Sequence, residues 1–227
     1  ILMSGANADF TNHNLVKIGT VPVGGFGIQL EESADFENNS RVEILGALGG
    51  GVFNNGDFNN NVAASVLLID NCDTAFINQR NLNNFNRDGQ ILIEDFKVGI
   101  LNNRVTPAFA SINNSGMLRI QNTPANANDL CLQNINGGFF TNNGCAIIEL
   151  FGRFENKAST LRNLGFFILE QTPNFAPLTN EGTFQNDGVV EDVQQRLVGG
   201  RITNNDGLLH QTCAGNPQNG LIQKVIQ

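Results

Sequence analysis

Residues 138–152 read GFFTNNGCAIIELFG, and the phrase that opens this stretch decides the fold: a small residue, any residue, an apolar residue, any residue, then Asn. Residues 34–48 repeat the pattern as ADFENNSRVEILGAL. Recurrence of one short phrase indicates a chain that stacks one small unit on the next. Each copy ends in a corner asparagine, and these are Asn12, Asn38, Asn55, Asn103, Asn142, Asn156, Asn180, Asn186 and Asn204.

The longer unit reads as a strand, an Asn corner and a second strand. Second arms such as Val16-Lys17-Ile18 and Val42-Glu43-Ile44 alternate apolar and polar residues, as a strand with one buried face does. Asn and Gly suit the corners because both tolerate positive φ. We expect a corner Asn to hydrogen-bond to its counterparts in the rungs above and below, which forms an amide ladder.

These patterns predict an all-β fold, a parallel β-helix (β-solenoid) with Asn/Gly-rich corners. We expect a single solenoid domain over residues 1–214 and a strand-like tail over residues 215–227. An antiparallel sandwich is the alternative, because Asn-Gly is also a strong hairpin signal. Recurrence of one phrase favours the solenoid. Residues 189–197 are the only stretch that reads as a short helical turn.

Composition indicates a filled interior and excludes some partners. Of the 227 residues, 41% are hydrophobic, with 17 Phe and neither Trp nor Tyr, which suits a dry core of stacked rings. The formal net charge of −8 argues against a nucleic-acid partner and against docking on an anionic membrane. No apolar run approaches the roughly 20 residues of a membrane helix, so we expect no membrane insertion.

The chain has four cysteines, Cys72, Cys131, Cys145 and Cys213. An even number in a Lys-poor chain suits an oxidising, extracellular setting. Three pairings are possible, and we favour Cys131 with Cys145, since Cys72 and Cys213 would lie several rungs apart. Those two would then be free, paired through a folded-back tail, or paired between subunits. The alternative is four buried thiols that act as small hydrophobes.

The sequence predicts no catalytic residue, cofactor or metal site. His210 and Cys213 form an H-x-x-C pair, but no second pair accompanies them. The alternative function is a polysaccharide-active lyase or glycosidase, since hydrolysis needs only two carboxylates that face one groove. The absence of Trp and Tyr disfavours such a carbohydrate site. The candidate carboxylates are Glu31, Glu32, Asp35, Glu37, Asp70, Asp73, Glu94, Asp95, Glu191 and Asp192.

The phrases G-x-F-x-N and N-x-G-x-apolar resemble the repeats of filamentous-haemagglutinin-like adhesins and of Asn-rich bacterial surface proteins with a right-handed parallel β-helix. The resemblance lies in repeat style and covers residues 8–209. It implies right-handed coiling and a non-enzymatic scaffold that is secreted or exposed at the cell surface. A surface glycan or a host protein would suit such a scaffold, and the sequence names neither.

The ends of the solenoid suggest assembly. A short solenoid leaves a row of unpaired backbone groups at each end. The last residues are strand-like and mostly apolar. We therefore expect self-association into an extracellular filament, end to end or by exchange of a terminal strand. The alternative is a tail that caps its own solenoid. The apolar residues of the tail are Leu221, Ile222, Val225 and Ile226.

Overall fold

The computed structural model describes residues 1–5, 7–21, 24–105, 109–122, 129–170, 178–192, 197–198 and 201–204. All regular structure in these residues is β, and every strand pairing is parallel. The chain winds as a β-solenoid, in which each rung contributes a strand to each of three faces. The predicted tail residues Leu221, Ile222, Val225 and Ile226 lie outside the described residues.

Face 1 holds the strands that end in the first asparagine of each rung. Its strands pair in sequence order with no shift of register between them. They are β2 (Asp9–Asn12), β5 (Asp35–Asn38), β8 (Asp57–Asn60), β10 (Asn81–Asn84), β12 (Ser111–Asn114), β15 (Phe139–Asn142), the carboxyl halves of β17 (Arg153–Asn163) and β19 (Leu178–Asn186), and β22 (Arg201–Asn204).

Face 2 follows face 1 in each rung from β2 to the carboxyl half of β19. Its strands are β3 (Leu15–Ile18), β6 (Arg41–Leu45), the amino halves of β9 (Val66–Asn78) and β11 (Gln90–Asn103), β13 (Met117–Gln121), β16 (Ile147–Leu150), β18 (Phe166–Leu169) and β20 (Val189–Asp192).

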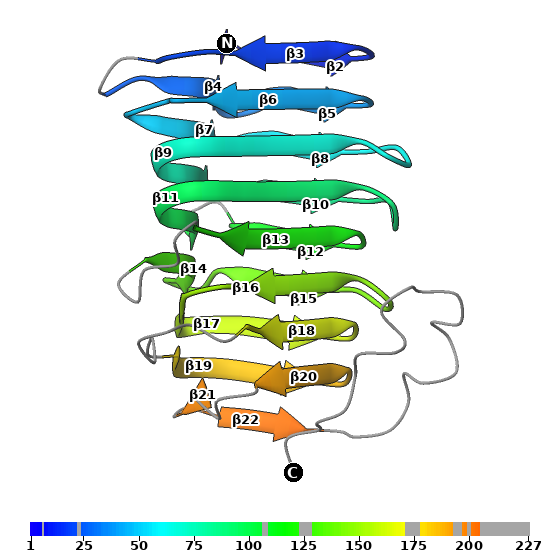
Figure 1. The fold of residues 1–227 in the computed structure, drawn as a ribbon, viewed down its shortest axis with the longest axis vertical. Helices are drawn as coiled ribbons and strands as arrows, with labels where there is room; N and C mark the ends of the chain where they lie inside the picture. Colours follow the sequence, from blue (N-terminus) through cyan, green and yellow to red (C-terminus); the bar gives the residue numbers. More distant parts are fainter. Residues whose placement is uncertain are drawn as a thin grey trace.

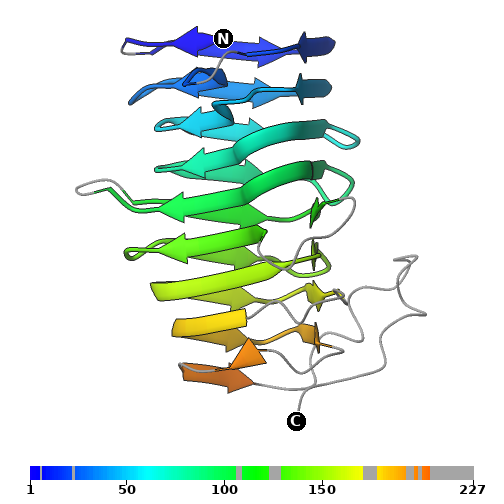
Figure 2. The same ribbon diagram turned by 60° about the vertical axis from the view of Figure 1, so that its left-hand side comes forward.

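Face 3 closes each rung and leads into the next. Its strands are β1 (Leu2–Met3), β4 (Phe26–Leu30), β7 (Gly50–Asn54), the carboxyl halves of β9 and β11, β14 (Leu130–Ile135), the amino halves of β17 and β19, and β21 (Leu197–Val198). In Figure 1 the face 2 strands cross the front towards the left and those of face 1 return behind, which is a right-handed coil. Figure 2 shows the same rungs piled into one stack.

In-register stacking brings like side chains together in the core. Phe10, Phe36 and Phe58 occupy the same position in successive rungs. Their ring centroids lie 5.1 and 4.9 Å apart in stacked geometry, and Phe36 and Phe58 are fully buried. Such ring pairs contribute about 1 kcal/mol each beyond the burial of their apolar area. Face 2 adds Val42, Leu67 and other aliphatic side chains to one continuous core.

The corners between faces 2 and 3 depend on residues that accept a left-handed backbone. Asn71 and Asp95 align in successive rungs and have φ of 57° and 47°, where β9 and β11 bend. Asn and Asp tolerate this region better than other side chains. Gly51 lies near the same corner for another reason. A Cβ there would lie 2.4 Å from the Ala75 carbonyl oxygen and 2.6 Å from Ile69 Cγ2.

Two expectations are corrected. The helical turn over residues 189–197 is wrong at its start, because Val189–Asp192 is strand β20, paired in register with β18. Residues 193–196 lie outside the description. The pairing of Cys131 with Cys145 is also wrong. Cys131 is a fully buried thiol at the start of face 3, whereas Cys145 lies before face 2, so the whole of β16 separates them.

Candidate functional site

The first asparagine ladder runs along the corner between faces 1 and 2. Each Nδ2 donates to the Oδ1 of the next member at 2.8 to 2.9 Å, and every member is at most 4% exposed. Asn204 aligns with Asn186 in the backbone register. The ladder therefore follows the solenoid from its first rung. Its members are Asn12, Asn38, Asn60, Asn84, Asn114, Asn142, Asn163 and Asn186.

A second ladder runs along the corner between faces 3 and 1. Its amides are fully buried and join at 2.7 to 2.8 Å. Two residues expected in such a ladder, Asn55 and Asn103, lie one position beyond members and are half-buried. Asn103 instead accepts a hydrogen bond from Asn136 Nδ2 at 2.8 Å. The members of the second ladder are Asn54, Asn78, Asn102, Asn134, Asn156 and Asn180.

Each ladder amide also ties the corner to its neighbouring rung, as Asn38 illustrates. Its Nδ2 donates to Asn60 Oδ1 at 2.8 Å and to the Val66 carbonyl at 3.0 Å. Its Oδ1 accepts from Asn12 Nδ2 at 2.8 Å and from the Ser40 backbone N–H at 3.2 Å. Two donors and two acceptor positions complete the capacity of a side-chain amide. Asn38 is therefore a fully satisfied structural group.

The ladders are polar along the stack. Among the described residues, each amide-to-amide bond in the two ladders runs from the Nδ2 of one rung to the Oδ1 of the following rung, from Asn12 to Asn38 onward. Hydrogen bonds that point in one direction polarise one another, which strengthens the ladder as a whole. The amides carry no charge and contain no nucleophile or general base. The arrangement holds rungs in register and gives the solenoid two chemically different ends.

Sequence reasoning found only part of the ladders. It identified Asn12, Asn38 and Asn142, for example, but passed over members in other local contexts. The signal for several of these was an Asn doublet at the end of an alternating tetrapeptide, as in DFNN and SINN. The second Asn of that doublet ends the strand and turns inward. The members missed are Asn54, Asn60, Asn78, Asn84, Asn102, Asn114, Asn134 and Asn163.

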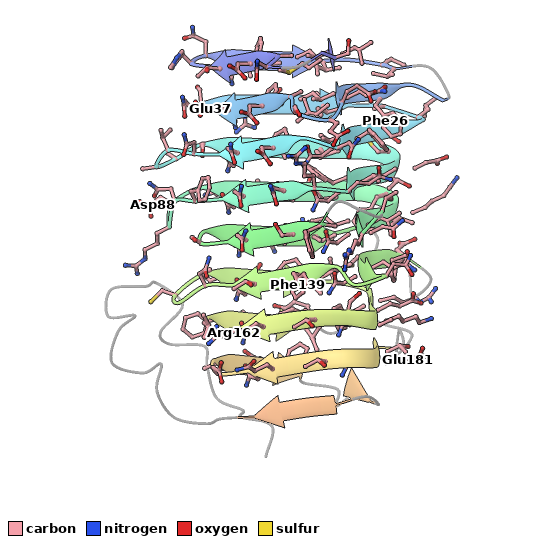
Figure 3. All side chains as sticks on the ribbon, turned by 180° about the vertical axis from the view of Figure 1, so that it is seen from behind. Phe26, Glu37, Asp88, Phe139, Arg162 and Glu181 are labelled. Atoms are coloured by element: carbon pink, nitrogen blue, oxygen red, sulfur yellow. The ribbon has the colours of Figure 1, made fainter. Side chains whose placement is uncertain are left out.

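Polar side chains also line the outer surface of face 1, which Figure 3 shows from behind with Glu37, Phe139 and Arg162 labelled. Asn83 Nδ2 donates to Asn59 Oδ1 at 2.9 Å, and Asn113 Nδ2 donates to Asn83 Oδ1 at 2.9 Å. These amides are only half-buried. This outer ladder competes with water, so we expect it to contribute less than the buried ladders.

Carboxylates stack at the amino end of face 1. Asp9, Asp35 and Asp57 align in successive rungs. Partial burial raises the pKa of the Asp35 carboxyl, and the neighbouring charges of Asp57 and Asp9 raise it further, while Arg80 opposes the shift. At neutral pH the three carboxylates of this column repel one another. Asn81 relieves part of it, because its Nδ2 donates to Asp57 Oδ1 at 2.6 Å.

Most of the remaining candidate carboxylates lie along the outside of the stack, and the side chain of Asp192 lies outside the description. Asp70 and Glu94 align in neighbouring rungs of face 2, and burial followed by the charges of Asp95 and Glu94 raises the pKa of Asp70. Asp73 pairs with Lys97 at 2.7 Å. Burial also raises the pKa of Glu191. Within the described ranges no group of three or more His, Cys, Asp or Glu side chains is arranged to hold a metal ion.

No family model, curated protein or solved structure matches this chain. The described residues contain no helix that could cross a membrane. His210 of the H-x-x-C pair lies outside the description. The candidate site therefore consists of two buried amide ladders and a polar outer face.

Proposed function

We propose that this protein is a non-enzymatic structural subunit of an extracellular surface filament or adhesin, assembled by end-to-end β-pairing. The ladders and the stacked core support the proposal, because each rung binds its neighbour with side chains of the same kind on both sides. An end rung of one copy can therefore bind an end rung of another copy through the same kinds of side chain. The similarity in repeat style to filamentous-haemagglutinin-like adhesins favours the same role.

The observation that carries the proposal is the one-sided pairing of the first rung. Among the described residues, β2 pairs with β5 and β3 with β6, and their opposite edges have no strand neighbour. The backbone N–H groups of Asp35 and Asn39 donate to the carbonyls of Ala8 and Asn12. In a parallel pair the intervening residues point their N–H and C=O groups the other way. Thr11 therefore presents its backbone groups to the open edge.

The polarity of the ladder specifies the direction of assembly. Asn12 offers an Oδ1 acceptor at the amino end, and each later amide points its Nδ2 donor towards the carboxyl end. A donor meets an acceptor only when copies stack head to tail. Such a contact is heterologous and does not close on itself, so it produces open filaments.

Negative-stain electron microscopy over a series of protein concentrations tests this proposal. We expect rods that join end to end as the concentration rises, with one direction of strand winding along each polymer. Particles that stay single and of one length at every concentration would reject the assembly.

A matched pair of variants at Thr11 tests the edge itself. Thr11→Pro removes the outward N–H without touching the bonds between β2 and β5, and proline is tolerated at strand edges. Thr11→Val keeps that N–H and the β-branched shape. We expect the proline variant alone to lose its polymers while both keep the far-UV circular dichroism of the parent. Equal polymerisation of the two variants would show that this edge is not the interface.

A further inference from the structure

Asn-Gly dipeptides lie at three corners of the described part of the chain, each between two strands. They are Asn55-Gly56, Asn136-Gly137 and Asn143-Gly144. In an Asn-Gly dipeptide the glycine nitrogen can reach the side-chain carbonyl carbon of the Asn, because glycine has no Cβ to obstruct the approach. The attack requires a glycine N–H that is free to lose its proton and a backbone that is free to rotate. The structure gives the three dipeptides different surroundings.

Asn55-Gly56 meets neither requirement. Gly56 is buried, and its N–H donates to Asn54 Oδ1 at 3.2 Å inside the second ladder. Its carbonyl accepts a hydrogen bond from the Asn81 N–H at 3.2 Å. A Cβ at Gly56 would collide with the Ala34 carbonyl oxygen, so the backbone has no room to rotate. We therefore expect the amide of Asn55 to be protected in the folded protein.

Asn136-Gly137 lies nearer the surface, but its glycine N–H is engaged. The Gly137 N–H donates to the Ala158 carbonyl at 2.8 Å and to Ser159 Oγ at 3.2 Å. Asn136 Nδ2 donates to Asn103 Oδ1 at 2.8 Å, which holds the exposed side chain against the neighbouring rung. A hydrogen-bonded N–H loses its proton only when the structure opens locally. We therefore expect this dipeptide to be protected as well.

Asn143-Gly144 meets both requirements. It lies at the corner between β15 and β16, where Gly144 is exposed and no described residue accepts a hydrogen bond from its N–H. A Cβ added to Gly144 would meet nothing within 4 Å, so the backbone has room to rotate. The side chain of Asn143 is half-buried, and its Nδ2 donates to Ser115 Oγ at 3.0 Å. A single hydrogen bond to a side-chain hydroxyl therefore restrains this amide.

We propose that Asn143 is a modification site, whose amide is lost through a cyclic succinimide while Asn55 and Asn136 stay intact in the folded protein. Hydroxide removes the proton of the Gly144 N–H, and the nitrogen attacks Asn143 Cγ. The new C–N bond closes the ring, the bond from Cγ to Nδ2 breaks, and Nδ2 leaves as ammonia after it takes a proton from water. Water then opens the ring. The net change consumes one water, releases one ammonia and transfers no electrons.

The products alter a corner on which the stack depends. Ring opening at Cγ gives aspartate, and opening at the backbone carbonyl gives isoaspartate, which lengthens the main chain by one atom. Either product adds a negative charge at neutral pH. The preceding residue, Asn142, belongs to the first ladder, and the Asn143 carbonyl accepts from the Ala146 N–H at 3.1 Å. The site lies several rungs from the open edge at Thr11, so this assignment is independent of the proposed filament role.

Peptide mapping of the full chain, stored folded at mildly alkaline pH, tests the assignment. Samples are digested with pepsin at acidic pH, which stops ring closure, and mass spectrometry follows the replacement of NH2 by OH in each Asn-Gly peptide. We expect Asn143 to convert at least about tenfold faster than Asn55 and Asn136, at a rate that rises with hydroxide concentration. Equal rates at the three positions, or faster conversion at either of the other two, would overturn the proposal.

Two controls separate the folded structure from the local sequence. In protein unfolded by urea we expect the three dipeptides to convert at similar rates, and a preference for Asn143 that persisted there would show that the fold does not select it. Gly144→Ala keeps the N–H and fits the open space, but its methyl group obstructs the attack. We expect conversion of Asn143 to slow about tenfold in this variant. An unchanged rate in Gly144→Ala would rule out ring closure by the Gly144 nitrogen.

Discussion

At the scale of single residues, side-chain amides provide the hydrogen bonds that the buried corners of the solenoid need. Each buried Asn carries two donors and two acceptor positions, and Asn38 uses all four. A buried polar group without partners costs about 1 to 3 kcal/mol, so the ladders are stable only when they are continuous. The neighbouring outer amides meet water and carry no such requirement.

The two kinds of ladder can be compared at adjacent positions. Asn84→Ala removes a buried member and leaves Asn60 without its acceptor and Asn114 without its donor. We expect the free energy of unfolding in urea to fall by about 3 kcal/mol. The matched control, Asn83→Ala, breaks the half-exposed outer ladder and should cost about 0.5 kcal/mol. Equal losses would mean that burial of the ladder is not what gives it its strength.

The carboxylate column predicts a pH dependence. The pKa of Asp35 is higher in the folded state than in the unfolded chain. At pH values just above the ordinary pKa of an aspartate, the folded state therefore binds more protons, and the free energy of unfolding falls as the pH rises. Asp35→Asn removes the repulsion. We expect a gain of about 0.5 kcal/mol in the free energy of unfolding at neutral pH, shrinking to nothing near about pH 3. The charge-matched control Asp88→Asn, in the exposed corner visible in Figure 3, should show no such gain. A gain that is constant with pH would contradict this explanation.

At the scale of strands and corners, sequence patterns predict the parallel solenoid and its Asn corners but not the number of faces. The expected unit had two strands, whereas each rung has three, because β9 and β11 run through the corner between faces 2 and 3 without a turn motif. The pairing of Cys131 with Cys145 is wrong for a related reason, because the two cysteines lie at different corners with the length of face 2 between them. The doublets Asn54-Asn55 and Asn102-Asn103 offered two candidates each, and only the backbone register selects the inward one.

The tight corner at Gly51 gives a prediction at this scale. Gly51→Ala would drive a methyl group into the Ala75 carbonyl and the Ile69 side chain. We expect a loss of about 3 kcal/mol in the free energy of unfolding, since packed cores resist added volume. Gly144→Ala is the matched control, because nothing lies within 4 Å of its added methyl group. A small effect at Gly51 would mean that the rungs are spaced more widely than described.

At the scale of the whole molecule, the stack behaves as a one-dimensional array in which each rung contacts its neighbours. Stability then depends on the continuity of the ladders and the core, and the ends become the sites where the molecule meets others. The proposed filament uses the amino end.

The strands of the solenoid are parallel and in register, with one strand spacing per rung. Glu37, Thr141 and Arg162 share one outward column with Thr11. Spin labels at cysteines introduced there report the spacing by pulsed electron paramagnetic resonance, while the high pKa of the buried Cys72 thiol keeps it from reacting.

This measurement uses three doubly labelled variants: Glu37→Cys with Thr141→Cys, Glu37→Cys with Arg162→Cys, and Thr11→Cys with Arg162→Cys. The account predicts separations of roughly 19, 24 and 29 Å, which rise by one strand spacing at each step. Separations that fail to rise with rung number, as hairpins folded back on one another would give, would contradict it.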